Sequence, residues 1–313
     1  MKRIKPLNDY NTTSIALTNY CQSKELTYNE LAIGITNIHH LLYKRGVQKN
    51  DRVLITNENT ALWAMKLAAI VTYGGVAVTA PYRLSASQQA TIMTDAHVVT
   101  CLDDIDNLDA LLCPTGVRPI NIDIFSFSLD DDIIIDYRFD LLGILKAETT
   151  QVRQFMQLAD DIKTRYSSLR HSRTPSMLLA NQASIDPKEV LAALSIGAHI
   201  TLAGTQPSSA TLLKCLKKYR PHFVYLDAHT AEKLIRDRVM PMLYSVNKPN
   251  YMVSSVTRRN LMKQARKRMM FALGGCLLTV CVTGGKFSPD IETFLQRIDF
   301  PYQIIDLRTN LTS

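Results

Sequence analysis

Alternating helix and strand patterns in the first hundred residues constrain the fold of this chain more than any other feature. Apolar residues recur at helical spacing from Leu26 to Leu42. Thr27 and Glu30 are placed for a capping box at the start of this helix, and Gly46 is placed for a left-handed end. The apolar run Val53–Ile55 then predicts a short buried strand.

The same order repeats twice along the chain. Asn57 and Asn59 open a second helical pattern that ends at Gly74, and residues 76–78 read as a strand. A third helix is predicted from about Ser85, before a strand that starts at residues 98–99. This alternation predicts an α/β fold of layered, mainly parallel sheets flanked by helices.

Composition is that of a globular protein. The 313 residues, 46% of them hydrophobic, can bury a large core as one large domain or as two. We expect subdomains of roughly 1–170 and 171–313. The net charge of +8 suits anionic partners, but it is dispersed, so nucleic acid is not an expected partner. The basic N-terminus lacks an apolar signal region, and Met269–Val282 is shorter than the roughly 18 residues of a membrane span. We therefore expect a cytoplasmic protein without a transmembrane segment, and a buried strand at Met269–Val282.

Two groups of carboxylates and several scattered histidines raise the question of a metal site. The aspartates cluster at residues 103–109 and 130–132, with no histidine at ligand spacing beside them. We interpret both runs as solvated turns. His199, His222 and His229 are isolated, so packing or surface roles are expected for them.

Three segments in this order resemble a known family. LTYNEL, GVQKNDRVLI and NENTALWAMKLAAIVTYGGVAVTAPY are similar to the opening of the adenylate-forming (AMP-binding) acyl-CoA synthetase superfamily, although Asn50 replaces a usual glycine. The later segment KKYRPHFVYLDAHTAEKLIRDRVMP is most like long-chain fatty-acyl-CoA ligases. The resemblance implies the fold of their large N-terminal domain, and it implies ATP or AMP, Mg²⁺ and coenzyme A as ligands.

The stretch Leu145–Leu158, LKAETTQVRQFMQL, lies where the family has a strand followed by Y-T-S-G-T-T-G-x-x-K-G, a loop around the ATP phosphates. Laid on this stretch without a gap, the motif places its threonine pair on Thr149 and Thr150. Its three glycines and its lysine fall on Glu148, Gln151, Phe155 and Gln154. Side chains at glycine positions block close backbone approach, and a left-handed conformation costs them roughly 1–2 kcal/mol.

The same stretch has a second interpretation. Val152, Phe155 and Met156 could form the apolar face of an ordinary helix. The sequence therefore leaves two alternatives for Leu145–Leu158, a degenerate phosphate loop or a helix.

The other family positions are partly kept. Gln182 stands where the resemblance implies a histidine beside the acyl pocket, and glutamine does not titrate near neutrality. Gly284 and Gly285 keep a glycine pair expected under the adenine. Thr309 keeps a threonine, whereas Asn310 replaces a magnesium-binding glutamate.

These departures predict a degenerate synthetase-like protein that does not adenylate fatty acids alone. We expect a binding or accessory subunit whose partner is an acyl chain, an acyl carrier protein or a separate catalytic subunit. The basic segment Arg258–Arg268 could also face a lipid head group, although a solvated helix face is the preferred interpretation. The C-terminal lid domain of the family is expected to be absent. The alternatives are an acyl-adenylate-forming ligase whose C-terminal domain is supplied in trans, and a relic without molecular function.

Overall fold

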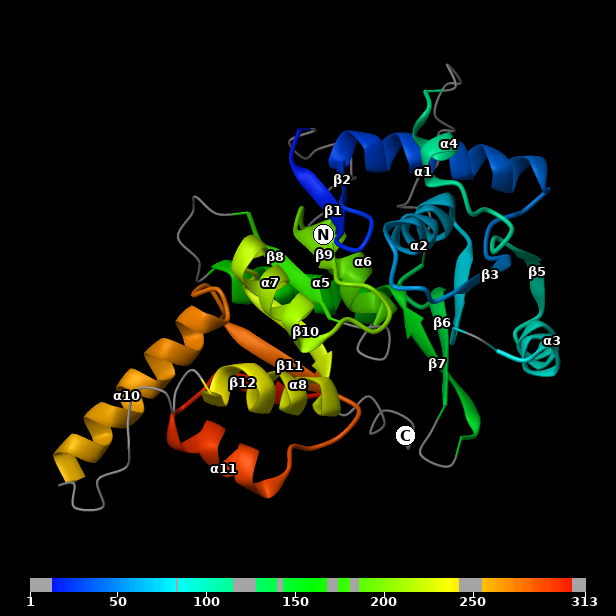
Figure 1. Ribbon diagram of the computed structural model, residues 1–313. Helices are drawn as coiled ribbons and strands as arrows, with labels where there is room; N and C mark the ends of the chain where they lie inside the picture. The colour runs from blue at the N-terminus through cyan, green and yellow to red at the C-terminus, as the bar shows by residue number, and fades with distance from the viewer. Residues whose placement is uncertain are drawn as a thin grey trace. The chain divides into compact units, whose positions relative to one another are not determined.

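The computed structural model describes residues 13–82, 84–114, 128–139, 143–167, 174–180, 186–241 and 255–305 (Figure 1). The chain divides into two compact units. Unit 1 comprises Met1–Thr174, Asp186–Ile200 and Asn310–Ser313, and unit 2 comprises Pro175–Ile185 and Thr201–Thr309. Both contain parallel strands and helices, which confirms the predicted α/β fold class.

A five-stranded sheet of order β5-β3-β4-β6-β7 forms the framework of unit 1. Its strands are β3 (Arg52–Thr56), β4 (Val76–Ala80), β5 (Val98–Cys101), β6 (Asp132–Phe139) and β7 (Leu145–Gln151). The pairs β5–β3, β3–β4 and β4–β6 are parallel, and β7 pairs antiparallel with β6. The alternation read from the first hundred residues therefore predicts β3, β4 and β5 correctly.

Helices and a short hairpin complete unit 1. They are β1 (Ile15–Asn19), β2 (Lys24–Thr27), α1 (Tyr28–Lys44), α2 (Ala61–Tyr73), α3 (Ala86–Asp95), α4 (Leu108–Leu112), α5 (Val152–Ser167) and α6 (Pro187–Ser195). The predicted capping box is present, because Thr27 Oγ1 accepts from Glu30 N and Glu30 Oε2 accepts from Thr27 N. The cap of α2 is Thr60, which corrects the prediction that Asn57 and Asn59 open this helix.

Helices α1 and α2 pack closely in unit 1. A Cβ atom at Gly34 would lie 2.2 Å from Met65 Sδ, so a larger residue there would require the Met65 side chain to move. On the same helix, His39 Nε2 lies 3.0 Å from both Ala69 O and Thr72 Oγ1. Helix α2 is buried along Ala61–Val71, which suits its almost continuous apolar sequence.

Unit 2 contains a second set of strands, of order β12-β11-β10-β8-β9. These are β8 (Ser176–Leu179), β9 (His199–Leu202, whose first two residues belong to unit 1), β10 (Phe223–Asp227), β11 (Thr279–Thr283) and β12 (Tyr302–Ile304). The helices are α7 (Ser209–Tyr219), α8 (Ala228–Leu234), the π-helix η4 (Ile235–Val239), α10 (Ser255–Ala272) and α11 (Pro289–Arg297). The pairings β8–β10, β10–β11 and β11–β12 are parallel.

The apolar run Met269–Val282 forms two kinds of structure. Met269–Ala272 completes α10, and the strand begins at Thr279, so the predicted buried strand is correct only for the end of the run. Gly274 and Gly275 have positive φ values of 102° and 79°, which separates the helix from the strand. Within the described residues, we find no helix long and apolar enough to cross a membrane.

Candidate functional site

The stretch Leu145–Leu158 contains a strand followed by a helix, which corrects both alternatives predicted for its first half. Leu145–Gln151 forms β7, and α5 begins at Val152. Thr149 pairs with Ile135 and Thr150 with Ile134 across the β6–β7 hairpin. The helical alternative holds from Val152 onward, where Phe155 is buried.

The candidate site residues in this stretch differ in their exposure and in their hydrogen bonds. Thr149 is exposed, whereas Thr150 is 4% exposed on the strand. Gln154 Oε1 accepts a hydrogen bond of 2.9 Å from Gln151 N at the start of α5. Gln154 thus satisfies a backbone donor at a helix end.

A cluster of charged side chains lies on the hairpin and at the start of α6. Arg138 and Lys188 are the cations, and Asp136, Glu148 and Asp186 are the carboxylates. Arg138 Nε contacts Asp136, whose carboxylate also accepts from Thr79 Oγ1. Lys188 Nζ lies 2.7 Å from Glu148 Oε1 and 3.5 Å from Asp186 Oδ2, while Arg138 Nη2 lies 3.6 Å from Asp186 Oδ1. We call these five residues the hairpin ion cluster.

Burial and ion pairing compete in the hairpin ion cluster. Burial raises the pKa of Asp136, although the Arg138 guanidinium and the Thr79 hydrogen bond act against this rise. Burial by itself lowers the pKa of Arg138 and of Lys188, but the neighbouring carboxylates outweigh it and raise both pKa values. Both side chains therefore stay cationic at neutral pH, held by carboxylates of the same chain.

The position of β6 suggests a different register for the phosphate-loop motif. Strand β6 ends at Phe139. A motif whose first three residues complete this strand would start at Tyr137, eight residues before Leu145. With the motif moved by eight residues, its tyrosine falls on Tyr137, its middle glycine on Gly143 and its lysine on Lys146. Gly143 has a φ of +73°, the conformation that favours glycine. The other two glycine positions fall on Asp140 and Ala147.

The placement on Leu145–Leu158 rests on the threonine pair Thr149–Thr150, whereas the shifted placement rests on the spacing of Tyr137, Gly143 and Lys146. Arg138 then occupies the first threonine position of the motif, and its guanidinium is engaged by Asp136 and Asp186.

The described residues of the hairpin ion cluster do not fit a polyphosphate. Three carboxyl groups face two cations, so the cluster offers no excess positive charge. Within the described parts of the chain, no group of three or more His, Cys, Asp or Glu side chains is placed to hold a metal ion.

The predicted glycine pair lies in unit 2, directly after β11. Gly284 and Gly285 have φ values of 72° and 152°, and a Cβ atom at Gly284 would lie 3.8 Å from Asp227 Cβ. Thr283, just before them, is 1% exposed. The turn leads to Phe287, whose ring packs edge-on against Tyr302 at a centroid distance of 5.4 Å. Gln182, Thr309 and Asn310 lie outside the described residues.

The aspartate runs take part in local structure. Asp103 accepts from Thr56 N and from Thr56 Oγ1 at 2.8 and 2.5 Å, and Asp104 lies 2.5 Å from Arg45 Nη2. Asp130 Oδ1 lies 2.7 Å from Arg153 Nη2. These carboxylates bind backbone groups, a hydroxyl and arginines along the surface.

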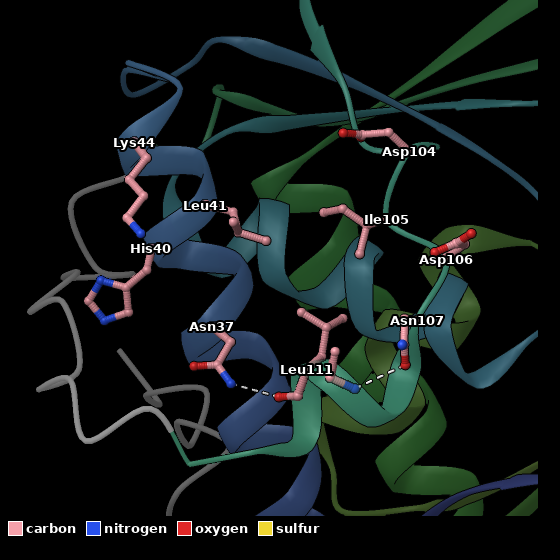
Figure 2. A pocket seen from close by; sticks show the side chains of 10 residues that line it. Asn37, His40, Leu41, Lys44, Asp104, Ile105, Asp106, Asn107 and Leu111 are labelled. Carbon is pink, nitrogen blue, oxygen red and sulfur yellow. Dashed lines mark hydrogen bonds between the residues drawn. The ribbon is translucent and has the colours of Figure 1, made fainter.

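A hollow of about 440 Å³ lies between α1 and the segment that leads into α4 (Figure 2). His40 and Lys44 line it from α1, and Asp104 and Asp106 line it from the other segment. Asn37 Nδ2 donates to Leu111 O at 2.7 Å and so fastens α1 to α4. The mixed charges of this hollow favour no single class of ligand.

The comparisons with known proteins agree with this architecture. Residues 9–130 match the AMP-binding enzyme family. That match covers the α1–β3–α2–β4 segment on which the sequence resemblance rests. No curated protein matches the chain.

Solved structures extend the likeness over most of the chain. VinN has a TM-score of 0.65 at 14% identity, with 95% of this chain and 71% of VinN covered. The N-terminal subdomain of Klebsiella oxytoca NpsA has a TM-score of 0.65 at 16% identity, with 93% and 69% covered. A variant of o-succinylbenzoate CoA synthetase (MenE) from Bacillus subtilis has a TM-score of 0.66 at 14% identity, with 92% and 55% covered. The fold is that of the N-terminal domain of adenylate-forming enzymes.

Proposed function

We propose that this chain is a degenerate AMP-dependent synthetase-like protein, related to long-chain fatty-acyl-CoA ligases, that does not adenylate fatty acids alone. It acts as a binding or accessory subunit for an acyl chain, an acyl carrier protein or a separate catalytic subunit. The observation that supports this proposal is the hairpin ion cluster. Its charges stand beside the shifted phosphate-loop motif and neutralise one another.

The physical reason is electrostatic. A phosphate loop stabilises a polyanion with backbone N–H groups and with cations whose charge is available. Here the guanidinium of Arg138 and the ammonium of Lys188 are held by Asp136, Asp186 and Glu148. A nucleotide phosphate would have to displace these carboxylates or lie beside them. Asp140 and Ala147 at glycine positions add side chains where the motif has none.

The test is ATP–pyrophosphate exchange with the full chain across fatty acids of different length. We expect no exchange above a Lys146→Ala variant, and no thermal shift with Mg²⁺–ATP. A catalytically competent adenylate-forming enzyme measured in parallel shows that the assay works. Exchange by the natural chain that Lys146→Ala abolishes would overturn the proposal.

A variant with a restored motif sharpens the test. Asp140→Gly, Leu141→Thr, Leu142→Thr and Ala147→Gly together rebuild most of the loop. If lost backbone approach is the main defect, this variant gains a thermal shift with Mg²⁺–ATP. If the hairpin ion cluster is the main defect, the gain appears only when Glu148→Gln is added.

The second candidate function is acyl-adenylate formation with a C-terminal domain supplied in trans. Gly143 and Lys146 favour it, because the shifted register keeps one glycine and the lysine of the motif. This candidate predicts acyl-AMP once a partner protein is added, and loss of that product in Lys146→Ala. An accessory subunit predicts that Lys146→Ala leaves the activity of the assembled complex unchanged.

A further inference from the structure

A basic and partly apolar surface lies in unit 2 between α7 and α10. Its cations are Lys217 from α7 and Lys263, Arg266, Lys267 and Arg268 from α10, around a hollow of about 910 Å³. No Asp or Glu is among the described residues that line the hollow. Phe271, near the end of α10, is 79% exposed. We call this region the basic–aromatic surface.

The fold brings these groups together through the end of α10. A Cβ atom at Gly274 would lie 2.3 Å from Leu216 O, so the absence of a side chain there lets the chain after α10 approach α7. Met269 is fully buried and anchors the last turns of the helix. Lys217 on α7 therefore stands beside the lysines of α10.

Helical geometry arranges the exposed groups in a stripe. Lys263, Lys267 and Phe271 follow one another at intervals of four residues, so they share one side of α10. All three are exposed. At 1.5 Å per residue the stripe is about 12 Å long and ends in an aromatic ring.

The positive charge of this surface is largely unbalanced. Arg266 contacts Asp299, but within the described residues Lys217, Lys263, Lys267 and Arg268 form no ion pair. Like charges four residues apart on a helix destabilise it. An anionic partner would relieve this repulsion, which the protein alone leaves in place.

We infer that the basic–aromatic surface docks on an anionic lipid bilayer, a property that goes beyond the proposed function. A bilayer offers many phosphate groups across a broad plane, which suits cations spread over two helices. Its interfacial region also accepts an exposed aromatic ring without a matching pocket. A single small anion would use one or two of these cations and leave Phe271 in water.

The test is co-sedimentation of the full chain with vesicles. We expect binding to an equimolar phosphatidylcholine–phosphatidylglycerol mixture and little binding to phosphatidylcholine alone. Each cation near an anionic surface contributes about fivefold in affinity, so Lys263→Ala with Lys267→Ala should weaken binding roughly 25-fold. The Lys263→Arg, Lys267→Arg variant should keep the binding, because the attraction depends on charge.

The contribution of Phe271 has a separate readout. Phe271→Trp should show a blue-shifted emission on the mixed vesicles, over a constant background from the buried Trp63. The emission should not shift on phosphatidylcholine alone.

A matched control removes two exposed lysines elsewhere, Lys49→Ala with Lys163→Ala, and should change binding less than the double variant in α10. Equal weakening by both double variants would overturn the inference, since net charge alone would then explain binding. Equal binding to both vesicle types would also overturn it. Release by inorganic phosphate, but not by chloride at the same ionic strength, would overturn it in favour of a small-anion site. Circular dichroism of each variant verifies that it is folded.

Discussion

Two pairs of basic groups in unit 1, one buried and one half-buried, have pKa shifts in opposite directions. On α1 and α2, burial lowers the pKa of His39 to about 4 and also lowers the pKa of Lys66. On β6 and α6, the pKa values of Arg138 and Lys188 are raised, although burial alone would lower them. The difference lies in the neighbours, because carboxylates lie within ion-pair distance of the second pair.

This contrast distinguishes the packed helices α1 and α2 from the hairpin ion cluster by the neighbours of their basic groups. Near α1 and α2 desolvation by burial is the largest cause of the pKa shift of both bases, and for Lys66 the charges of Asp103 and Glu58 oppose it only in part. In the hairpin ion cluster the chain supplies counter-ions from three elements and keeps the charged forms. The same loss of hydration therefore has a different outcome for each pair.

The largest effect is expected for Arg138→Met. This change leaves Asp136 and Asp186 without the guanidinium that neutralises them, and it should lower the free energy of unfolding by about 3–5 kcal/mol. Urea denaturation at neutral pH measures it. The control is Arg153→Met, because its pair with Asp130 is 61% and 69% exposed and should contribute below about 1 kcal/mol. Equal losses in the two variants would break the comparison.

Acidification tests the neutral state of His39. Its folded pKa is about 4, below the ordinary 6.5, so the unfolded chain binds a proton at this residue first as the pH falls. The stabilising contribution is present above pH 6.5 and is lost between pH 6.5 and 4, by about 3 kcal/mol in total. His39→Gln should remove this part of the pH dependence of unfolding, whereas the exposed His97→Gln should not. A pH dependence that is identical in both variants contradicts the assignment.

A smaller effect is expected for Glu148→Gln. Lys188 would lose a charged acceptor at 2.7 Å, and the free energy of unfolding should fall by about 2 kcal/mol. The matched change Glu25→Gln, on the exposed part of β2, should stay within about 0.5 kcal/mol. If both changes have the same effect, Glu148 is only a surface carboxylate.

The smallest effect is expected for Lys66→Met. The change in the free energy of unfolding should be zero or positive, whereas for Arg138→Met it should be negative. Lys66 is 6% exposed, and no hydrogen bond or ion pair holds it within the described residues. Replacing it with an apolar side chain of similar length should leave the free energy of unfolding unchanged or raise it by about 1 kcal/mol. A loss as large as that of Arg138→Met would show that both cations depend on carboxylates.

The scaffold was predictable because its signals are local. The capping box of Thr27 and Glu30, the left-handed Gly46 and the apolar strands near Val53 and Val76 all involve residues within a few positions of one another. Such signals lie in the printed sequence whatever the rest of the chain does. The family resemblance carried by these segments agrees with the match over residues 9–130.

For the candidate site, the sequence indicated which segment to consider but not its secondary structure or its contacts. The sequence Leu145–Gln151 contains only two apolar residues, Leu145 and Ala147, which is too short an alternation to indicate a strand. It becomes one because its backbone pairs with β6. The charge on Glu148 was visible, but its partner Lys188 lies 40 residues away.

The sequence by itself determined the α/β class, the helices and strands of the first hundred residues, and the places where the phosphate-loop and glycine-pair segments should be sought. The tertiary structure decided that Leu145–Gln151 is an edge strand and that Arg138 and Lys188 pair with carboxylates of the same chain. The physical reason is the distance along the sequence over which each interaction acts. Helical periodicity and caps act over about one turn of chain, whereas strand pairing and buried ion pairs join residues that only folding brings together.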